Sequence, residues 1–126
     1  MLAGIDAIAT VGVRDLGAAR KFYESILGLK VVHTEGEGAI EFQAGKSKLL
    51  VYVSEFAGTN QATAVTWTVG RNVEEIVRDL KAKGVTFEHY DFPDTPISGD
   101  IHRAGRLRLA WFKDPDGNII ALVGDS

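Results

Sequence analysis

The sequence predicts an α+β fold in which a βαβββ module occurs twice. Strand-like and helix-like patterns follow one another in the order strand, helix, strand, strand, strand, and this order occurs twice along the 126 residues. Matching features also recur at a constant offset, since the spacing from Val13 to Val69 equals that from Gly28 to Gly84. We therefore predict one domain, 1–126, with a first module at 1–58 and a second module at 59–126.

The first module opens with a segment rich in small and β-branched residues, which predicts a strand over Ile5–Val13. Asp15 is a suitable N-cap for a helix over Leu16–Leu27, whose apolar residues recur at helical spacing. Gly28 is the expected C-terminal stop. Gly-containing turns then separate three predicted strands: Leu29–Thr34, Ala39–Ala44 and Leu49–Ser54.

The second module repeats this pattern. Ala64–Val69 is a predicted strand, and its alternation places Trp67 on the core side. Asn72 is predicted to cap a helix that ends at Gly84, with Glu75 at the position that a capping box requires. Three further strands are predicted at Val85–Phe92, Leu107–Phe112 and Asn118–Val123. The long loop Pro93–Arg106 is expected to be a lid or binding segment.

A tight turn is predicted at Asp114-Pro115-Asp116-Gly117, between two apolar runs. Pro115 presets φ for the second position of the turn, and Gly117 tolerates a left-handed exit. The last two strands therefore form a hairpin.

The composition is that of an ordinary globular protein. Hydrophobic residues make up 45% and charged residues 25%, and the net charge of −3 disfavours non-specific binding to nucleic acid. The chain has no cysteine, which excludes disulfides, thiolate metal sites and cysteine nucleophiles. No apolar run approaches the roughly 20 residues of a membrane span, and no signal peptide is visible at the start. We expect a cytoplasmic protein that binds neither membranes nor nucleic acid.

Two segments within this doubled module, DLGAARKFYESILGLKVV and WFKDPDGNIIALV, resemble the vicinal oxygen chelate superfamily, which includes glyoxalase I, bleomycin-resistance proteins and extradiol dioxygenases. The resemblance covers nearly the whole chain. It implies that the two modules form a curved mixed sheet around a cavity, and that two chains pair as a homodimer.

Enzymes of this superfamily hold a divalent metal with His, Gln or Glu from the first and last strands of each module. Counted from Asp15 and from the tight turn, three of these positions correspond to Ile8, Ala64 and Ala121. The fourth lies near Val51, within one residue. Because metal ions of this kind need imidazole or carboxylate donors, the resemblance predicts the fold without its usual metal site, and no cofactor.

Polar side chains on the predicted strands are the first candidates for ligand contacts. If Ile40 and Phe42 pack toward the helix, Glu41 and Gln43 point into the concave face, where Glu41 could also act as a base; a solvated outer face is the alternative. Three threonines are further candidates for binding a ligand: Thr10, Thr66 and Thr68.

Aromatic and histidine residues complete the candidates. Tyr52 and Trp111 offer apolar area with a polar group and are predicted to line the pocket, whereas we place His33 and His89 at the surface. His102 lies in the predicted loop beside Asp100 and Arg103; we favour a solvent-exposed cluster there over a catalytic histidine.

Two functions follow as hypotheses. The first is a metal-free protein that binds a drug or metabolite in the cavity of a dimer. The second is an enzyme of the superfamily that works without metal, with Glu41 or His102 as acid or base, or with a different set of metal ligands. A partner-binding module without a ligand ranks below both.

Overall fold

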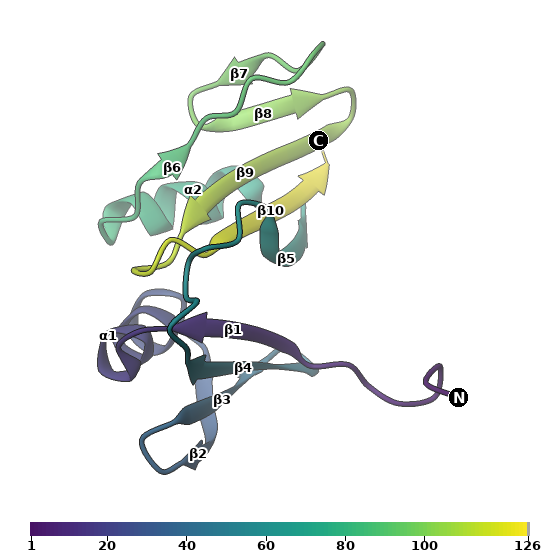
Figure 1. Ribbon diagram of the computed structural model, residues 1–126. Coiled ribbons are helices and arrows are strands. Elements are labelled where there is room, and N and C mark those ends of the chain that lie inside the picture. The colour runs from purple at the N-terminus through teal and green to yellow at the C-terminus, as the bar shows by residue number, and fades with distance from the viewer. Residues whose placement is uncertain (126) are drawn as a thin grey trace. The chain divides into compact units, whose positions relative to one another are not determined.

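The computed structural model describes residues 1–125. The chain divides into two compact units, Met1–Thr59 and Asn60–Ser126, and each combines helix with a sheet of mixed strand directions (Figure 1). The predicted α+β class with two βαβββ modules is confirmed. No helix among the described residues is both long enough and apolar enough to cross a membrane.

The first unit follows the predicted order of elements, which are β1 (Ala9–Val13), α1 (Leu16–Arg20), a π-helical segment η1 (Lys21–Ile26), β2 (Lys30–Glu35), β3 (Ala39–Ala44) and β4 (Ser47–Val53). The strands are ordered β1-β4-β3-β2, with β1 parallel to β4. The first strand is shorter than the predicted Ile5–Val13, and β3 has the predicted bounds.

The helical region of this unit begins as predicted and ends differently. The Asp15 carboxylate accepts hydrogen bonds from the backbone N–H groups of Gly17 (2.9 Å) and Ala18 (3.2 Å), which is an N-cap. Toward the end, the N–H of Leu27 donates to the carbonyl of Phe22, five residues back, so the predicted single α-helix widens into a π-helix. Gly28, at φ +78°, then ends the helix.

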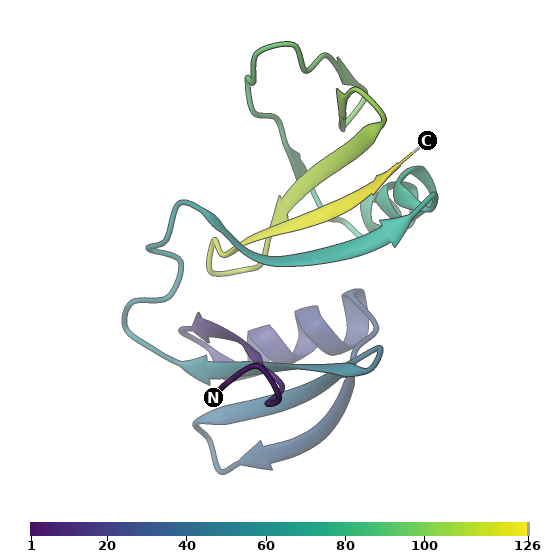
Figure 2. The ribbon, with the colours of Figure 1, turned by 90° about the vertical axis from the view of Figure 1, so that its right-hand side faces the viewer.

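α1 and η1 lie against one face of the first sheet (Figure 2). Tyr23 and Phe42 are fully buried, with ring centroids 5.9 Å apart, so Phe42 faces the helical layer. Ile40 and Val51 are buried as well and pair across β3 and β4, which places both on the same side. Ile40 and Phe42 thus pack toward the helical layer. Because side chains alternate along a strand, Glu41 and Gln43 point to the opposite, helix-free face of this sheet.

The second unit contains β5 (Thr63–Gly70), α2 (Val73–Ala82), β6 (Phe87–Glu88), β7 (Ile97–Ser98), β8 (Ile101–Ala104), β9 (Leu107–Lys113) and β10 (Ile119–Asp125). The strands are ordered β5-β10-β9-β8-β7, and β6 also pairs with β9. β6 and β8 each pair with part of β9, and so share the position that β2 alone occupies in the first unit.

Two predictions for this region are wrong. The predicted strand Val85–Phe92 is reduced to two residues, and the predicted loop Pro93–Arg106 contains the hairpin of β7 and β8. The cause is the pairing of β8 with β9 across a turn at Gly105, which has φ +62°. Local composition, rich in Pro, Gly and Asp, does not reveal this tertiary pairing.

The core of the second unit lies between α2 and its sheet. Ile120, Leu122 and Phe112 are buried on this side. Trp67, expected in the core, is only half-buried although it faces the same side. In the part of the chain that the structure describes, the Asn72 side chain makes no capping hydrogen bond, because its backbone is near φ −94°, ψ 11° rather than extended.

Candidate functional site

The predicted site residues of the first unit share one face of its sheet. Cross-strand partners point to the same side of a sheet. Thr10 and Glu41 both pair with Leu50, so they share a side. Tyr52, two residues after Leu50 on β4 and paired with Ala39, points to that side as well. This side is the helix-free face. Gln43 lies there too, but its amide donates to the carbonyl of its own turn at Gly45 (2.6 Å). The Glu41 carboxylate is paired with Lys48 Nζ at 3.3 Å.

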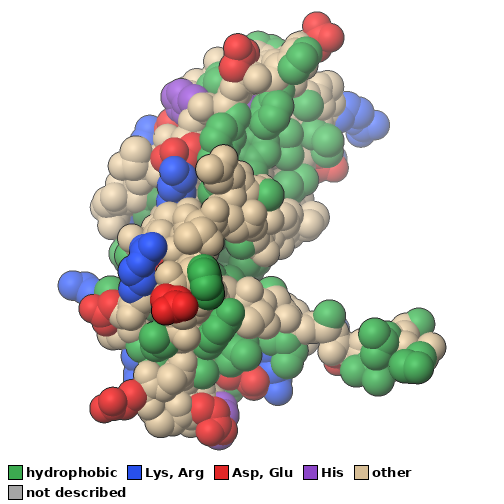
Figure 3. All heavy atoms as spheres, viewed as in Figure 1, with side chains coloured by type: hydrophobic (Ala, Val, Ile, Leu, Met, Phe, Trp, Pro, Cys, Tyr) green, Lys and Arg blue, Asp and Glu red, His purple; other side chains and the backbone are tan. Residues whose placement is uncertain are grey.

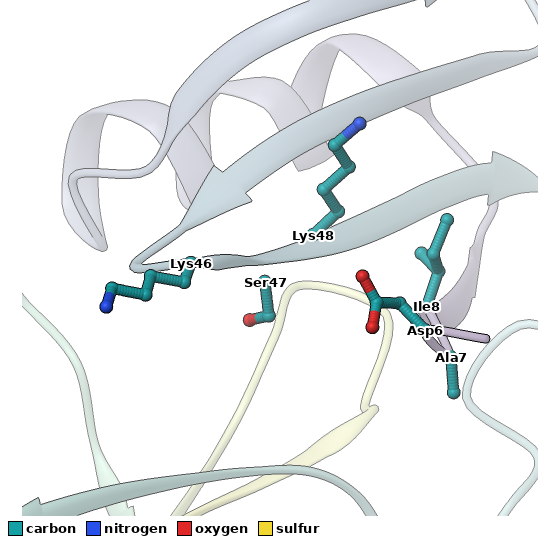
Figure 4. Close-up of a pocket in the computed structure, with 6 residues that line it drawn as sticks. All are labelled: Asp6, Ala7, Ile8, Lys46, Ser47 and Lys48. Carbon is teal, nitrogen blue, oxygen red and sulfur yellow. The ribbon is translucent and has the colours of Figure 1, made fainter. Parts of the chain in front are cut away.

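A pocket of about 500 Å³ lies at one end of this unit, and Ile8 lines it together with Asp6, Ala7, Lys46, Ser47 and Lys48. Figure 4 shows the two lysine side chains extending in different directions, so they do not converge on one ligand group. Lys48 is also the partner of Glu41. The pocket lacks aromatic residues, and its charges are already exposed to solvent, which makes it a weaker candidate than the second unit.

The second unit also presents a helix-free face. On β10, Ala121 pairs with Trp111 of β9 and with Thr66 of β5, and Val123 pairs with Thr68. These side chains therefore point away from α2. Hydrophobic side chains gather over β8 and β9 on the face turned to the viewer in Figure 3. The structure thus brings the predicted residues Thr66, Thr68 and Trp111 to one surface.

Four rings on this face form a cluster, which we call the aromatic cluster: Tyr90, Phe92, His102 and Trp111. The centroid of the Trp111 ring lies 4.8 Å from that of His102, 5.3 Å from that of Tyr90 and 5.6 Å from that of Phe92. Most of these contacts are edge-on or tilted, as the quadrupoles of aromatic rings prefer. The Trp111 indole Nε1 donates to Thr63 Oγ1 at 3.2 Å, which fixes the orientation of the ring.

His102 lies at the centre of this cluster and corrects the prediction of a solvent-exposed loop residue. Its exposed fraction is 0%. Its Nε2 accepts a hydrogen bond from the backbone N–H of Tyr90 at 2.9 Å, while its Nδ1 is buried with no partner among residues 1–125. Burial follows from the pairing of β8 with β9, which places His102 opposite Leu109 and beneath the rings.

Tyr90 and Phe92 are not among the candidate residues that the sequence pattern indicates. Both follow β6 in a segment without regular structure. The Tyr90 hydroxyl is buried without a partner in the described part of the chain. Its burial raises the pKa of the phenol, and the nearby carboxylate of Glu88 raises that pKa further. The alternation of Tyr90 and Phe92 before a glycine-centred hairpin is the signal that could have identified this cluster.

Asp100, Lys81 and His89 form a polar network next to His102. Asp100 accepts hydrogen bonds from Lys81 Nζ (2.6 Å) and His89 Nε2 (2.8 Å), and the His89 ring lies edge-on to His102 at 6.2 Å. His89 is exposed, as predicted. The hydrogen bond from Lys81 and then that from His89 lower the pKa of the Asp100 carboxyl. Asp100 thus links α2 to the edge of the aromatic cluster.

Replacing Asp100 by asparagine is expected to lower the free energy of unfolding by about 0.5 kcal/mol at neutral pH, since both partners of the carboxylate are half-exposed. The folded pKa is below the unfolded one, so this stabilisation is present above the ordinary aspartate pKa and is lost as the pH falls through the folded pKa. Urea unfolding of both proteins from pH 7 to about pH 3 tests this. A difference that persists undiminished at the acidic end would contradict it.

The metal positions implied by the family resemblance carry no donor side chain. Ile8 and Ala121 have aliphatic side chains, and so does Ala64, which alternation places beside Thr66. The fourth position is placed near Val51, within one residue. Val51 is fully buried on the helix side, and its neighbours on the helix-free face are Leu50 and Tyr52, neither of which carries an imidazole or a carboxylate. Side chains of this kind do not fit a divalent metal.

Solved structures with the same fold support this architecture. The lactoylglutathione lyase of Agrobacterium tumefaciens is 18% identical, with a TM-score of 0.75, over 98% of this chain and 96% of that one. The fosfomycin resistance protein FosX of Listeria monocytogenes, solved with Mn(II) and sulfate, is 17% identical, with a TM-score of 0.71. The match covers 100% of this chain and 93% of that one. An integron cassette protein from a metagenome of the Halifax Harbour sewage outfall is 16% identical, with a TM-score of 0.69, over 93% and 95%.

At these identities the structural likeness establishes the fold alone. The family is established separately, because the family model of the Glyoxalase/Bleomycin resistance protein/Dioxygenase superfamily matches residues 4–122. This match spans both units and includes the first segment that carries the resemblance and all but the last residue of the second. The chain therefore belongs to the Glyoxalase/Bleomycin resistance protein/Dioxygenase superfamily.

Proposed function

We propose that this protein binds a small molecule, a drug or metabolite, at the aromatic cluster, without the divalent metal used by enzymes of its superfamily. The observation that carries the proposal is the surface built around Trp111. Exposed or half-buried rings there stand beside Ala121, where the family resemblance implies a metal ligand. Aromatic and apolar area with a few polar groups is the usual lining of a ligand site.

The neighbouring side chains fit this proposal. Thr66 and Thr68 are exposed on the same helix-free face and offer hydroxyl groups. The Trp111 ring is held by Thr63, so little conformational entropy is lost when a ligand packs on it. The homodimer and the cytoplasmic location predicted from the sequence remain part of the proposal.

A pair of matched variants tests the site. Trp111→Leu removes the ring from the cluster, whereas Trp67→Leu removes a tryptophan of β5 that faces the opposite side of the same sheet. In a thermal-shift screen of drugs and metabolites, a ligand at a hundred times its dissociation constant should stabilise the unmodified protein by about 2.7 kcal/mol. We expect Trp111→Leu to abolish this gain and Trp67→Leu to retain it.

The proposal would be contradicted if no compound of a broad panel stabilised the protein. It would also be contradicted if both tryptophan variants lost stabilisation to the same extent, because the effect would then come from the sheet as a whole rather than from the aromatic cluster.

A second candidate function is acid–base catalysis at His102, and the buried, unpartnered Nδ1 favours it. Glu41, the other candidate base, is less suited because its carboxylate is paired with Lys48. Incubation of the protein with each stabilising compound, followed by mass spectrometry, separates the two functions. Conversion of a compound would support an enzyme, and recovery of unchanged compound supports a binding protein.

A further inference from the structure

Two buried polar atoms of the aromatic cluster lack a partner, and they indicate what the ligand must offer. In residues 1–125, Tyr90 Oη and His102 Nδ1 are the buried side-chain nitrogen and oxygen atoms without a hydrogen bond. Both belong to the same cluster, with ring centroids 6.3 Å apart. A buried polar group left unpaired costs free energy, so a ligand that supplies the missing partner gains affinity.

The hydrogen-bond geometry makes His102 Nδ1 a donor. A backbone N–H can only donate, so the 2.9 Å contact from Tyr90 N requires Nε2 of His102 to accept and to carry no proton. The proton of the neutral imidazole therefore lies on Nδ1. Tyr90 keeps its hydroxyl proton through the neutral range because burial and Glu88 raise its pKa. The cluster thus holds two neutral donors.

The charges around the cluster disfavour an anionic ligand. Glu88 pairs with Trp111 in the sheet and so points to the same face. Lys113 Nζ lies 3.6 Å from the Glu88 carboxylate and offsets part of its charge. Beyond His102, Asp100 is paired with both Lys81 and His89. None of these groups leaves an unpaired cation at the cluster, so the acceptor on the ligand is best uncharged.

We propose that the preferred ligand is a neutral, planar aromatic molecule with a carbonyl oxygen, which packs on Trp111 and accepts hydrogen bonds from His102 Nδ1 and Tyr90 Oη. This inference rests on the proposed function, since it specifies the ligand of the same site. Flat rings match the aromatic walls, and a carbonyl oxygen accepts two hydrogen bonds through its two lone pairs.

Phe92 is the exposed ring beside the two buried donors. It is the outermost ring of the cluster, 44% exposed, and its centroid lies 6.3 Å from that of His102. It belongs to a segment without regular structure that ends at the hairpin of β7 and β8. We therefore expect rotation of this side chain, rather than movement of the sheet, to admit a ligand to the donors.

Three naphthalene derivatives of similar size test the inference by isothermal titration calorimetry: 2-acetylnaphthalene has a neutral carbonyl, 2-ethylnaphthalene has no acceptor, and 2-naphthoate is an anion. We expect 2-acetylnaphthalene to bind about tenfold more tightly than either of the others, the gain from two hydrogen bonds after losses in solvation. Tyr90→Phe keeps the ring and removes one donor, so it should reduce this preference several-fold and leave the affinity for 2-ethylnaphthalene unchanged.

A spectroscopic measurement tests the donor without substitution of His102. Long-range ¹H–¹⁵N correlation spectra distinguish the tautomers of the three histidines, with His33→Gln and His89→Gln serving to assign the signals. The inference requires the proton of His102 on Nδ1 and a change in its ¹⁵N shift when 2-acetylnaphthalene binds. A proton on Nε2, or an unchanged shift at saturation, would overturn it.

The outcomes separate this inference from the proposed function. If 2-ethylnaphthalene or 2-naphthoate binds as tightly as 2-acetylnaphthalene and binding still depends on Trp111, the inference is wrong and the proposed site stands. If binding of all three compounds is insensitive to Trp111→Leu, both are wrong. Failure of 2-acetylnaphthalene to bind also overturns the inference.

Discussion

Replacing Gly124 by alanine is expected to lower the free energy of unfolding by about 3 kcal/mol or more. A Cβ atom at this position of β10 would lie 2.0 Å from the carbonyl oxygen of Gly70 and 2.6 Å from Cγ2 of Val73. The first contact is with backbone, so rotation of a side chain cannot relieve it. Either β10 separates from β5 or α2 is displaced, and both changes disrupt the core of the second unit.

Gly4→Ala is the matched control, because a Cβ there meets no atom within 4 Å. Urea unfolding of both variants, followed by circular dichroism, measures the difference. A loss below about 1 kcal/mol for Gly124→Ala would contradict the close approach of β10 and the start of α2. The result bears on the site as well, since β10 places Ala121 beside Trp111.

Asp114→Ala is expected to lower the free energy of unfolding by about 3 kcal/mol, because it disrupts the tight turn before β10. The buried Asp114 carboxylate accepts hydrogen bonds from the backbone N–H groups of Asp116 and Asn118, both at 2.9 Å, and from the side-chain amide of Asn118 at 2.8 Å. Alanine leaves these donors without their acceptor. The hairpin then loses the contacts that fix its geometry.

Asn118→Ala provides the comparison, because it removes only the amide contact and leaves both backbone contacts of Asp114 in place. We expect Asn118→Ala to lower the free energy of unfolding by about half as much as Asp114→Ala, or less. Equal losses in the same unfolding assay would show that the backbone contacts contribute little, contrary to this description of the turn.

The elements set by local chemistry could be predicted from the sequence. The Asp15 cap, the stop at Gly28 and the bounds of β3 follow from side-chain hydrogen bonding, φ preference and alternation, and all three are confirmed. The family was recognisable because its two segments retain these local signals.

The features that depend on tertiary pairing were missed. β8 exists because β9 offers it an edge, and nothing within Pro93–Arg106 reveals that edge. The burial of His102 follows from the same pairing, since the rings that cover it come from β9 and from the segment after β6. The π-helical segment Lys21–Ile26 likewise reflects hydrogen bonds that reach five residues back instead of four, which apolar periodicity does not detect.

The central claim, binding of a small molecule without a metal, is tested most directly by titrating 2-acetylnaphthalene into protein treated with EDTA and into the same protein supplied with Mn²⁺, Zn²⁺ or Ni²⁺. With aliphatic side chains at Ile8, Ala64 and Ala121, we predict the same affinity in every preparation and no stoichiometric metal by elemental analysis. Binding that is lost with EDTA and restored by one metal at one equivalent per chain would contradict the claim.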